Sequence, residues 1–416
     1  MKILHIYDEY DQVLPGEGSG PYIVYKLAKE MARADHDVTV LERQWEGTDR
    51  WSQRDDITFH RVKLYFCSDD SRNESSRPRN LIQTPTGVAK FLLDRSEMAL
   101  KIFAHLRQNE YDAIFVYSPF VANILVTLSS SVRNKTVYRD LIGEVDVRLG
   151  LTPKSDRPLA FRYILPDLYL IKRAGKTILQ NDRLRADVEE HEKVKPENVT
   201  AIPYGVDTDT FTPEIPHRSV RERYDLSANQ VVLYSSPLIP RKGFDHLVRA
   251  ADILVNEKGN DDILFVIKSR FYEDEYLTEL REMRRDYGLT NNLKLIINDI
   301  PFEDLKSMYV ASDVYVQPSL QDPCPTSLLE PMSCGQPLVG SDIGGISQMI
   351  EDGVNGYLVK PGDERTLASA IDKILSDPGL RQSMGQKSRE IAVERFDWNK
   401  IATRHLQVCH QITSNQ

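Results

Sequence analysis

Short apolar runs alternate along the chain with longer segments that carry apolar residues at helical spacing. The first run spans residues 2–7, and Val24, Leu27, Ala28 and Met31 then recur on one face of a helix. The alternation continues through apolar runs at 38–41, 111–117, 231–234, 263–267, 293–297, 313–317 and 337–340. Because strands that alternate with helices pair in parallel, this pattern predicts an α/β fold with parallel sheets.

Two series of such elements flank a segment that is typical of a linker. Residues 202–213 contain prolines, a glycine and turn-forming aspartates. A chain of 416 residues also exceeds what one hydrophobic core usually supports. We therefore expect one Rossmann-like domain over residues 1–204 and a second over 214–396. Residues 56–79, rich in charge, Ser and Asn, are expected to form a long exposed loop.

Composition narrows the class of protein. A formal charge of -9 with 41% hydrophobic residues fits a globular protein and gives no global attraction to nucleic acid. The four cysteines lie far apart without a CxxC pair, so neither a disulfide framework nor a zinc site is indicated. The chain start lacks a signal-peptide pattern, and no run approaches ~20 apolar residues. We expect a cytoplasmic protein with no nucleic-acid partner.

A glycine-rich turn follows the first predicted strand. The backbone amides of Gly18, Ser19 and Gly20 would converge at a helix N-terminus, with Pro21 at the first helical position. Such an arrangement can hold a diphosphate, although glycine-rich turns between a strand and a helix also occur for purely steric reasons.

Two basic residues occupy the corresponding place in the second series. Arg241 and Lys242 precede Gly243 and a helix with one apolar face. A cation here would lie at the carboxyl end of the sheet, where open α/β sheets bind ligands. A basic pair on a turn is more often simply solvated, so only the context favours a functional role for Lys242.

Residues 321–335 contain the most informative pair of acids. Asp322 follows a predicted strand, and Glu330 lies on the next helix beside Leu328, Leu329 and Met332. A carboxylate in apolar surroundings needs hydrogen-bond donors, and the vicinal hydroxyls of a sugar are suitable donors. Capping of backbone amides, or pairing with a nearby arginine, would satisfy Glu330 equally well.

These motifs, taken in order, resemble glycosyltransferase family 4 over nearly the full length. The motifs are the apolar start with its glycine-rich loop, 202–207 with Phe211, 241–243, 309–319, 322–335, 344–345 and 355–359. The resemblance implies the GT-B fold, in which two Rossmann-like domains face a central cleft. It also implies that residues 397–416 form a C-terminal helix that crosses back to the N-terminal domain.

The resemblance implies a retaining, metal-independent transfer of a hexose-type sugar from a nucleoside diphosphate sugar, without a further cofactor. Asp322 and Glu330 have the family's spacing of seven intervening residues, with Asp322 at a position that is usually Glu. Asp322 would then contact the sugar hydroxyls, Glu330 the ribose, and Lys242 the leaving diphosphate. The remaining phosphate contacts would come from Gly18, Ser19, Gly20, Cys324, Thr326 and Ser327.

The sequence departs from the family pattern at two places. Pro237 stands where an arginine usually accompanies the lysine, so Arg241 and Arg270, or Lys268, would supply the missing charge. A histidine that usually touches the donor sugar is also missing, and Arg139 and Asp140 occupy that loop.

Two rival functions and the acceptor stay open. A nucleotide-sugar epimerase of related fold, or a non-catalytic donor-binding subunit, would share much of this pattern. The acceptor could be lipid-linked or a small molecule. The amphipathic segment 88–106 and the basic residues between 133 and 173 would suit peripheral contact with the inner membrane face, although such helices usually pack on their own sheet.

Overall fold

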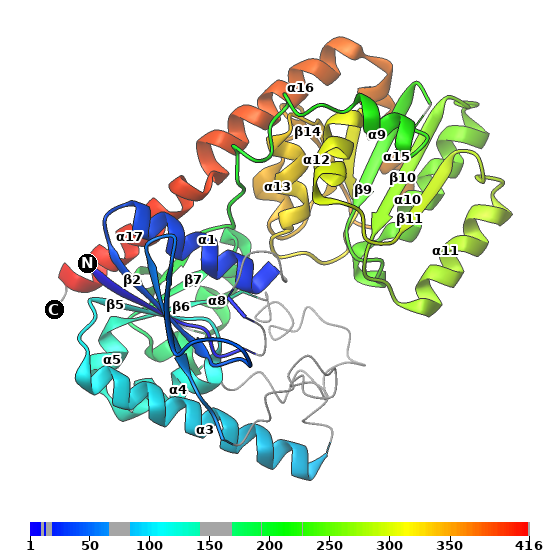
Figure 1. The fold of residues 1–416 in the computed structure, drawn as a ribbon. Helices are drawn as coiled ribbons and strands as arrows, with labels where there is room; N and C mark the ends of the chain where they lie inside the picture. Colours follow the sequence, from blue (N-terminus) through cyan, green and yellow to red (C-terminus); the bar gives the residue numbers. More distant parts are fainter. Residues whose placement is uncertain are drawn as a thin grey trace. The chain divides into compact units, whose positions relative to one another are not determined.

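The protein consists of two compact units (Figure 1). The computed structural model describes residues 1–9, 12–13, 19–65, 84–141, 169–192, 194–226 and 228–414. The first unit combines Met1–Ile202 with Trp398–Gln416, and the second unit spans Pro203–Asp397. The two Rossmann-like domains and the return of the C-terminal helix to the first domain were both predicted, and both are confirmed.

A sheet of eight strands forms the centre of the first unit. Its strand order is β3-β4-β2-β1-β5-β6-β7-β8, and every pairing is parallel except that of β3 with β4. The strands are β1 (Lys2–Ile6), β2 (Asp37–Arg43), β3 (Trp51–Arg54), β4 (Ile57–Val62), β5 (Ala113–Val116), β6 (Thr136–Arg139), β7 (Lys176–Leu179) and β8 (Val199–Ala201).

The exposed loop predicted at 56–79 was wrong for its first part. Residues 57–62 form β4, a buried strand that pairs with β2. The strand was missed because two of its residues, His60 and Arg61, are polar and find their partners on neighbouring strands. Arg61 donates a hydrogen bond to Glu42 at 2.9 Å, and the ring of His60 stacks on Trp51. Residues 66–83 lie outside the described part of the chain.

Six α-helices and one short 3-10 helix pack around this sheet in the described part of the chain. They are α1 (Ser19–Arg33), α3 (Pro85–Gln108), α4 (Pro119–Leu128), α5 (Ser130–Lys135), α8 (Asp182–Glu192), the short 3-10 helix η4 (Pro196–Asn198) and α17 (Trp398–Ser414). The side chain of Thr84 caps α3 by accepting from the amide of Gly87 at 3.1 Å. Pro21 is the third residue of α1, not the first as predicted. Helix α17 packs against α1.

The second unit is built on a six-stranded, fully parallel sheet of order β11-β10-β9-β12-β13-β14. Its strands are β9 (Gln230–Ser235), β10 (Ile263–Ser269), β11 (Leu293–Ile297), β12 (Val314–Gln317), β13 (Leu338–Ser341) and β14 (Gly356–Val359). The chain runs outward from β9 through β10 to β11, then returns to place β12 on the other side of β9. This reversal is the topological switch point at which open α/β sheets bind ligands.

The helical elements of the second unit lie between and beyond these strands. They are α9 (Arg218–Arg223), η5 (Pro240–Lys242), α10 (Phe244–Asp252), η6 (Ile253–Glu257), α11 (Asp274–Asp286), α12 (Phe302–Ala311), α13 (Thr326–Ser333), α14 (Ile346–Met349), α15 (Glu364–Ser376), α16 (Pro378–Ile391) and η7 (Ala392–Phe396). In the described part of the chain, no helix has both the length and the hydropathy to cross a membrane.

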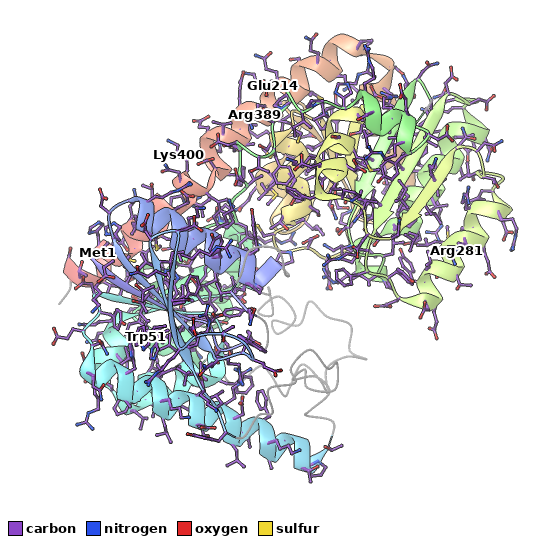
Figure 2. The ribbon with its side chains drawn as sticks, viewed as in Figure 1. Met1, Trp51, Glu214, Arg281, Arg389 and Lys400 are labelled. Carbon is purple, nitrogen blue, oxygen red and sulfur yellow. The ribbon has the colours of Figure 1, made fainter. Side chains whose placement is uncertain are left out.

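Most of the predicted linker belongs to the second unit. Arg389, labelled in Figure 2, donates to the backbone oxygens of Thr208 and Phe211 at 2.9 Å each. The buried ring of Phe211 packs against Tyr309. The segment after Ile202 is therefore fixed to the second unit by buried aromatic contact and charged hydrogen bonds, although its composition is that of a connecting loop.

Candidate active site

A chain of buried polar groups crosses the switch point of the second sheet. The hydroxyl of Tyr315 donates to the backbone oxygen of Ser235, the last residue of β9, at 2.9 Å. Gln317, the last residue of β12, donates to Ser319 at 2.8 Å, and Ser319 donates to Asp322 at 3.3 Å. Because each group satisfies its neighbour, the sheet can bury polar side chains up to the carboxyl ends of its strands.

Lys242 and Asp322 form an ion pair at the end of this chain of groups. Both residues are 6% exposed, and the lysine ammonium donates directly to the Asp322 carboxylate. The structure therefore brings together two of the three predicted catalytic residues. The positive charge of Lys242 is therefore offset by the carboxylate of Asp322.

Glycines allow the backbone to enclose this pair. Gly243 has a φ of 64°, and a Cβ atom at this position would overlap the backbone oxygen of Pro318. Gly344 has a φ of 46°, and its Cβ would overlap the backbone oxygen of Asp322 itself. The turns that carry Lys242 and Gly344 can thus pack directly on the loop after β12, which only glycine permits in these conformations.

Glu330 lies on α13 and accepts a hydrogen bond of 2.6 Å from the hydroxyl of Tyr309 on α12. Burial raises the pKa of Glu330 from 4.5 to about 7, whereas the Tyr309 bond and the charge of Lys268 act in the opposite direction. Neither an amide cap nor an arginine partner was therefore needed to satisfy this carboxylate. No sequence pattern pointed to Tyr309 as the partner of Glu330.

The N-terminus of α13 contains the other predicted phosphate contacts of this unit. Thr326 is the first helical residue, and no side chain in the described structure caps this end of the helix. The hydroxyl of Ser327 donates to Gln317 at 3.3 Å. Cys324 is buried, and its Sγ accepts from the amide of Tyr204 at 3.4 Å. Uncapped amides at a helix N-terminus favour an anion.

The predicted substitute cations do not enter this cluster. Arg241 is exposed and donates to the backbone oxygen of Gln321 at 3.3 Å. The exposed guanidinium of Arg270 lies 3.5 Å from the carboxylate of Asp299. Lys268, by contrast, is only 9% exposed; burial lowers its pKa, and the charge of Glu330 opposes this shift.

The predicted contacts from the first unit have mixed outcomes. Gly18 lies outside the described residues, and Ser19 and Gly20 open α1. Arg139 is 1% exposed and Asp140 is 3% exposed, so both side chains lie in the interior of the unit. A sugar contact by Arg139 and Asp140 stays a prediction, and their burial in this conformation does not favour it.

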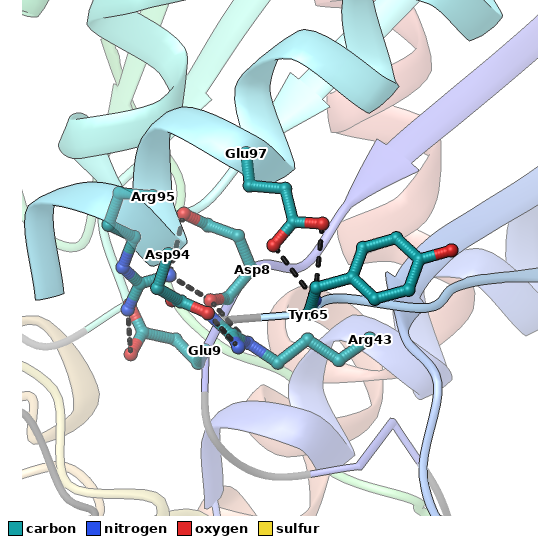
Figure 3. Close-up of polar contacts among 7 residues, drawn as sticks. All are labelled: Asp8, Glu9, Arg43, Tyr65, Asp94, Arg95 and Glu97. Atoms are coloured by element: carbon teal, nitrogen blue, oxygen red, sulfur yellow. Dashed lines mark hydrogen bonds and ion pairs between the residues drawn. The ribbon is translucent and has the colours of Figure 1, made fainter. Parts of the chain in front are cut away.

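A second ionic cluster, absent from the sequence predictions, lies at the end of β1 (Figure 3). Arg95 of α3 is 3.0 Å from the carboxylate of Asp8, and Arg43 donates to Asp94 at 2.8 Å. Burial raises the pKa of Asp8 to about 6, although Arg95 opposes this shift. Because β1 lies between β2 and β5, this cluster marks the switch point of the first sheet.

In the described part of the chain, no group of three His, Cys, Asp or Glu side chains could hold a metal ion. The polar groups at the second switch point instead combine a buried ion pair, a half-buried carboxylate and an uncapped helix N-terminus. These features suit a phosphorylated, polyhydroxylated ligand.

Two family models match consecutive parts of the chain. The model for Glycosyltransferase Family 4 matches residues 22–210, and the model for Glycosyl transferases group 1 matches residues 220–391. The chain belongs to glycosyltransferase family 4. Membership of this family confirms the resemblance inferred from the ordered motifs.

Curated relatives of this family 4 chain include two from mycobacteria. The GDP-mannose-dependent alpha-(1-6)-phosphatidylinositol monomannoside mannosyltransferase of Mycolicibacterium smegmatis is 31% identical over 49% of this chain and 54% of its own length. Alpha-maltose-1-phosphate synthase of Mycobacterium tuberculosis is 26% identical over 58% of this chain and 62% of its own length. The matches thus span little more than half of these relatives.

Solved structures show the same fold over the whole chain. Sucrose-phosphate synthase from Thermosynechococcus elongatus aligns with a TM-score of 0.77 at 19% identity and covers 100% of both chains. Anabaena HepE, solved in complex with UDP, aligns with a TM-score of 0.71 at 19% identity over 99% of this chain and 100% of that one. The fold of this family 4 chain is therefore GT-B.

Proposed function

We propose that this glycosyltransferase moves a hexose-type sugar from a nucleoside diphosphate sugar to an acceptor, with retention and without a metal ion. The observation that carries the proposal is the buried Lys242–Asp322 pair at the switch point of the second unit, where the uncapped N-terminus of α13 also lies. In support of a sugar nucleotide as donor, the structurally similar protein HepE was also solved in complex with UDP-glucose. The base and the sugar of the donor stay open.

The three predicted catalytic residues have distinct roles in this proposal. Glu330 accepts hydrogen bonds from the ribose hydroxyls, beside the hydroxyl of Tyr309. The ammonium group of Lys242 contacts the diphosphate of the bound donor as well as Asp322. The carboxylate of Asp322 then accepts a hydrogen bond from a hydroxyl of the transferred sugar. Lys242 and the α13 amides stabilise negative charge as it develops on the leaving group, which is a large term in transfer reactions.

The bond changes need no separate protein base. The bond between the anomeric carbon and the phosphate oxygen breaks, and the acceptor oxygen bonds to the same face of that carbon. The departing phosphate oxygen takes the proton of the acceptor hydroxyl. The protein orients the two reactants and stabilises the developing charge, which is sufficient when both reactants are held in the reactive geometry.

The deciding experiment offers candidate nucleotide sugars to the protein in the presence of a chelator. We expect one donor to release its nucleoside diphosphate, and the anomeric proton coupling in the NMR spectrum of the product to show the donor's configuration. An epimerase would convert the sugar nucleotide without releasing diphosphate in this way. A donor-binding subunit would be stabilised by the donor without turnover, and strict dependence on magnesium would also contradict the proposal.

We also propose that the acceptor meets the protein at a lipid surface next to α3. One face of α3 packs on the sheet, but Leu92, Leu93 and Leu100 on its other faces are 54%, 49% and 61% exposed. Lys90 is exposed on the same helix and suits anionic headgroups. Wild-type protein should sediment with vesicles that contain anionic lipid, and the L92E/L100E variant should not. Equal sedimentation of both would favour a small-molecule acceptor.

A further inference from the structure

Of the three cations named above as substitutes for the missing arginine, Lys268 is the one whose side chain is buried. It is the sixth residue of β10 and pairs in register with Ser235 at the end of β9. Only 9% of the residue is exposed. Within the described structure, its ammonium group has neither a hydrogen-bond acceptor nor a carboxylate within ion-pairing distance.

The strand directs Lys268 toward the candidate site. Side chains alternate between the faces of a strand, and Phe265 and Ile267 belong to the hydrophobic core on one face of β10. Lys268 therefore points away from this core. The charges of Lys268 and Glu330 influence each other, because each shifts the pKa of the other toward its ionised form.

The other cations near the site are already engaged. Lys242 contacts Asp322, Arg241 donates to a backbone oxygen, and Arg270 lies beside Asp299. Burial lowers the pKa of Lys268, so the protein bears a cost for keeping this cation dehydrated. A charged group that is buried at a free-energy cost, at the edge of a sheet where ligands bind, is typically a group whose partner is the ligand.

We propose that Lys268 binds the phosphate of the nucleotide that lies next to the ribose, as the second cation of the site beside Lys242. This inference rests on the proposed function and deepens it. The phosphate next to the ribose is the anionic group that can approach Lys268 while Glu330 holds the ribose hydroxyls. A lysine supplies a compact charge there.

The test compares three ligands that differ only in phosphate. Calorimetric titrations with a nucleoside, its monophosphate and its diphosphate, in the uridine, guanosine and adenosine series, are made on wild-type protein and on Lys268→Met. We expect Lys268→Met to weaken binding of the monophosphate and the diphosphate about tenfold or more, as for a lost charged hydrogen bond. Nucleoside binding should stay within about twofold.

Two further variants complete the test. Lys268→Arg keeps the charge and should retain most of the monophosphate affinity, whereas Arg281→Met removes an exposed cation on α11 of the same unit and should change none of the three affinities. Equal weakening of all three ligands by Lys268→Met would make Lys268 a positioning residue for Glu330 and overturn the proposal. Unchanged affinities would overturn it as well, while leaving the proposed function intact. Failure of wild-type protein to bind any ligand in the three series would overturn both.

Discussion

At the scale of single residues, Lys242 and Asp322 depend on each other for their burial. Both are almost fully enclosed, and each is the charge partner of the other. Removing one charge leaves the other buried without a counter-ion, which typically costs about 3–5 kcal/mol. A loss of activity in either single variant could therefore reflect lost stability, and only a double-mutant cycle separates the two effects.

We predict that Lys242→Met and Asp322→Asn each lower the free energy of unfolding by about 3 kcal/mol. The double variant should lose clearly less than the sum, because it buries no unpaired charge. Urea unfolding followed by far-UV circular dichroism measures all four proteins. Additive losses would mean that the two charges do not interact in solution. Even a fully stable double variant should not transfer sugar if Lys242 holds the diphosphate.

Glu330 allows a prediction about pH. Its pKa is raised to about 7, and only the ionised carboxylate accepts hydrogen bonds from both ribose hydroxyls. Nucleoside affinity should therefore rise by about tenfold between pH 6 and pH 8 in wild-type protein and stay flat in Glu330→Gln. Titration with the 2'-deoxynucleoside is the control, since it lacks one of the hydroxyls. A wild-type profile as flat as that of the variant would contradict the ribose contact.

The same shift affects stability with a definite sign. A carboxyl group whose pKa is raised by folding stabilises the protein below its unfolded pKa of 4.5, and this contribution is lost as the pH rises through about 7. Wild-type protein should consequently lose stability relative to Glu330→Gln between pH 5 and pH 8. Thermal unfolding of both proteins across this range gives the difference directly.

At the scale of elements, two glycines in left-handed conformation provide a matched pair. Gly344 has a φ of 46° and lies against the backbone of Asp322, whereas Gly353 has a φ of 76° with no atom within 4 Å of its would-be Cβ. Gly353→Ala should cost only the backbone strain, about 1 kcal/mol. Gly344→Ala adds a clash with backbone and should cost at least about 2 kcal/mol more, with a loss of nucleotide affinity.

The measurements for this pair are urea unfolding and nucleotide titration of both alanine variants. Equal losses of stability would show that the loop after β12 can move away from residue 344. In that case the close contact between the loops that carry Gly344 and Asp322 would not be needed to hold Asp322 in place.

Elements were predicted well where apolar periodicity alone specifies them. The predicted run at 293–297 coincides with β11, and the acids of 322–335 lie on the loop and helix assigned to them. Strand β4 was missed because the polar residues His60 and Arg61 make this segment resemble an exposed loop. Their partners lie on other strands, which the local sequence does not show. The partners within the site were missed for the same reason. Tyr309 and Glu330, or Lys242 and Asp322, meet only when distant segments fold together.

At the scale of the whole molecule, the distribution of tryptophans separates the two units. Trp45, Trp51 and Trp398 all belong to the first unit, and Trp51 is labelled in Figure 2. Intrinsic tryptophan fluorescence therefore reports unfolding of the first unit, whereas circular dichroism reports both units. Lys242, Lys268, Asp322 and Glu330, which carry the proposed donor contacts, all belong to the second unit.

We predict that a nucleoside diphosphate stabilises the transition seen only by circular dichroism, by about 2.7 kcal/mol at a hundredfold excess over its dissociation constant. The shift should be the same with magnesium as with a chelator. Denaturant unfolding with both signals recorded on one sample tests this. A shift confined to tryptophan fluorescence would place the ligand in the first unit and contradict the donor site.

Helix α17 completes the first unit only after the whole second unit has been synthesised. Its packing partner α1 leaves the ribosome early, but residues 203–397 must be translated before the first residue of α17 appears. At ~5–20 residues per second this interval lasts roughly 10 to 40 seconds. During that time the nascent chain exposes the surface of α1 that α17 later covers, while the second unit is free to fold. Order of translation thus makes the nascent first unit, rather than the second, the natural client of chaperones.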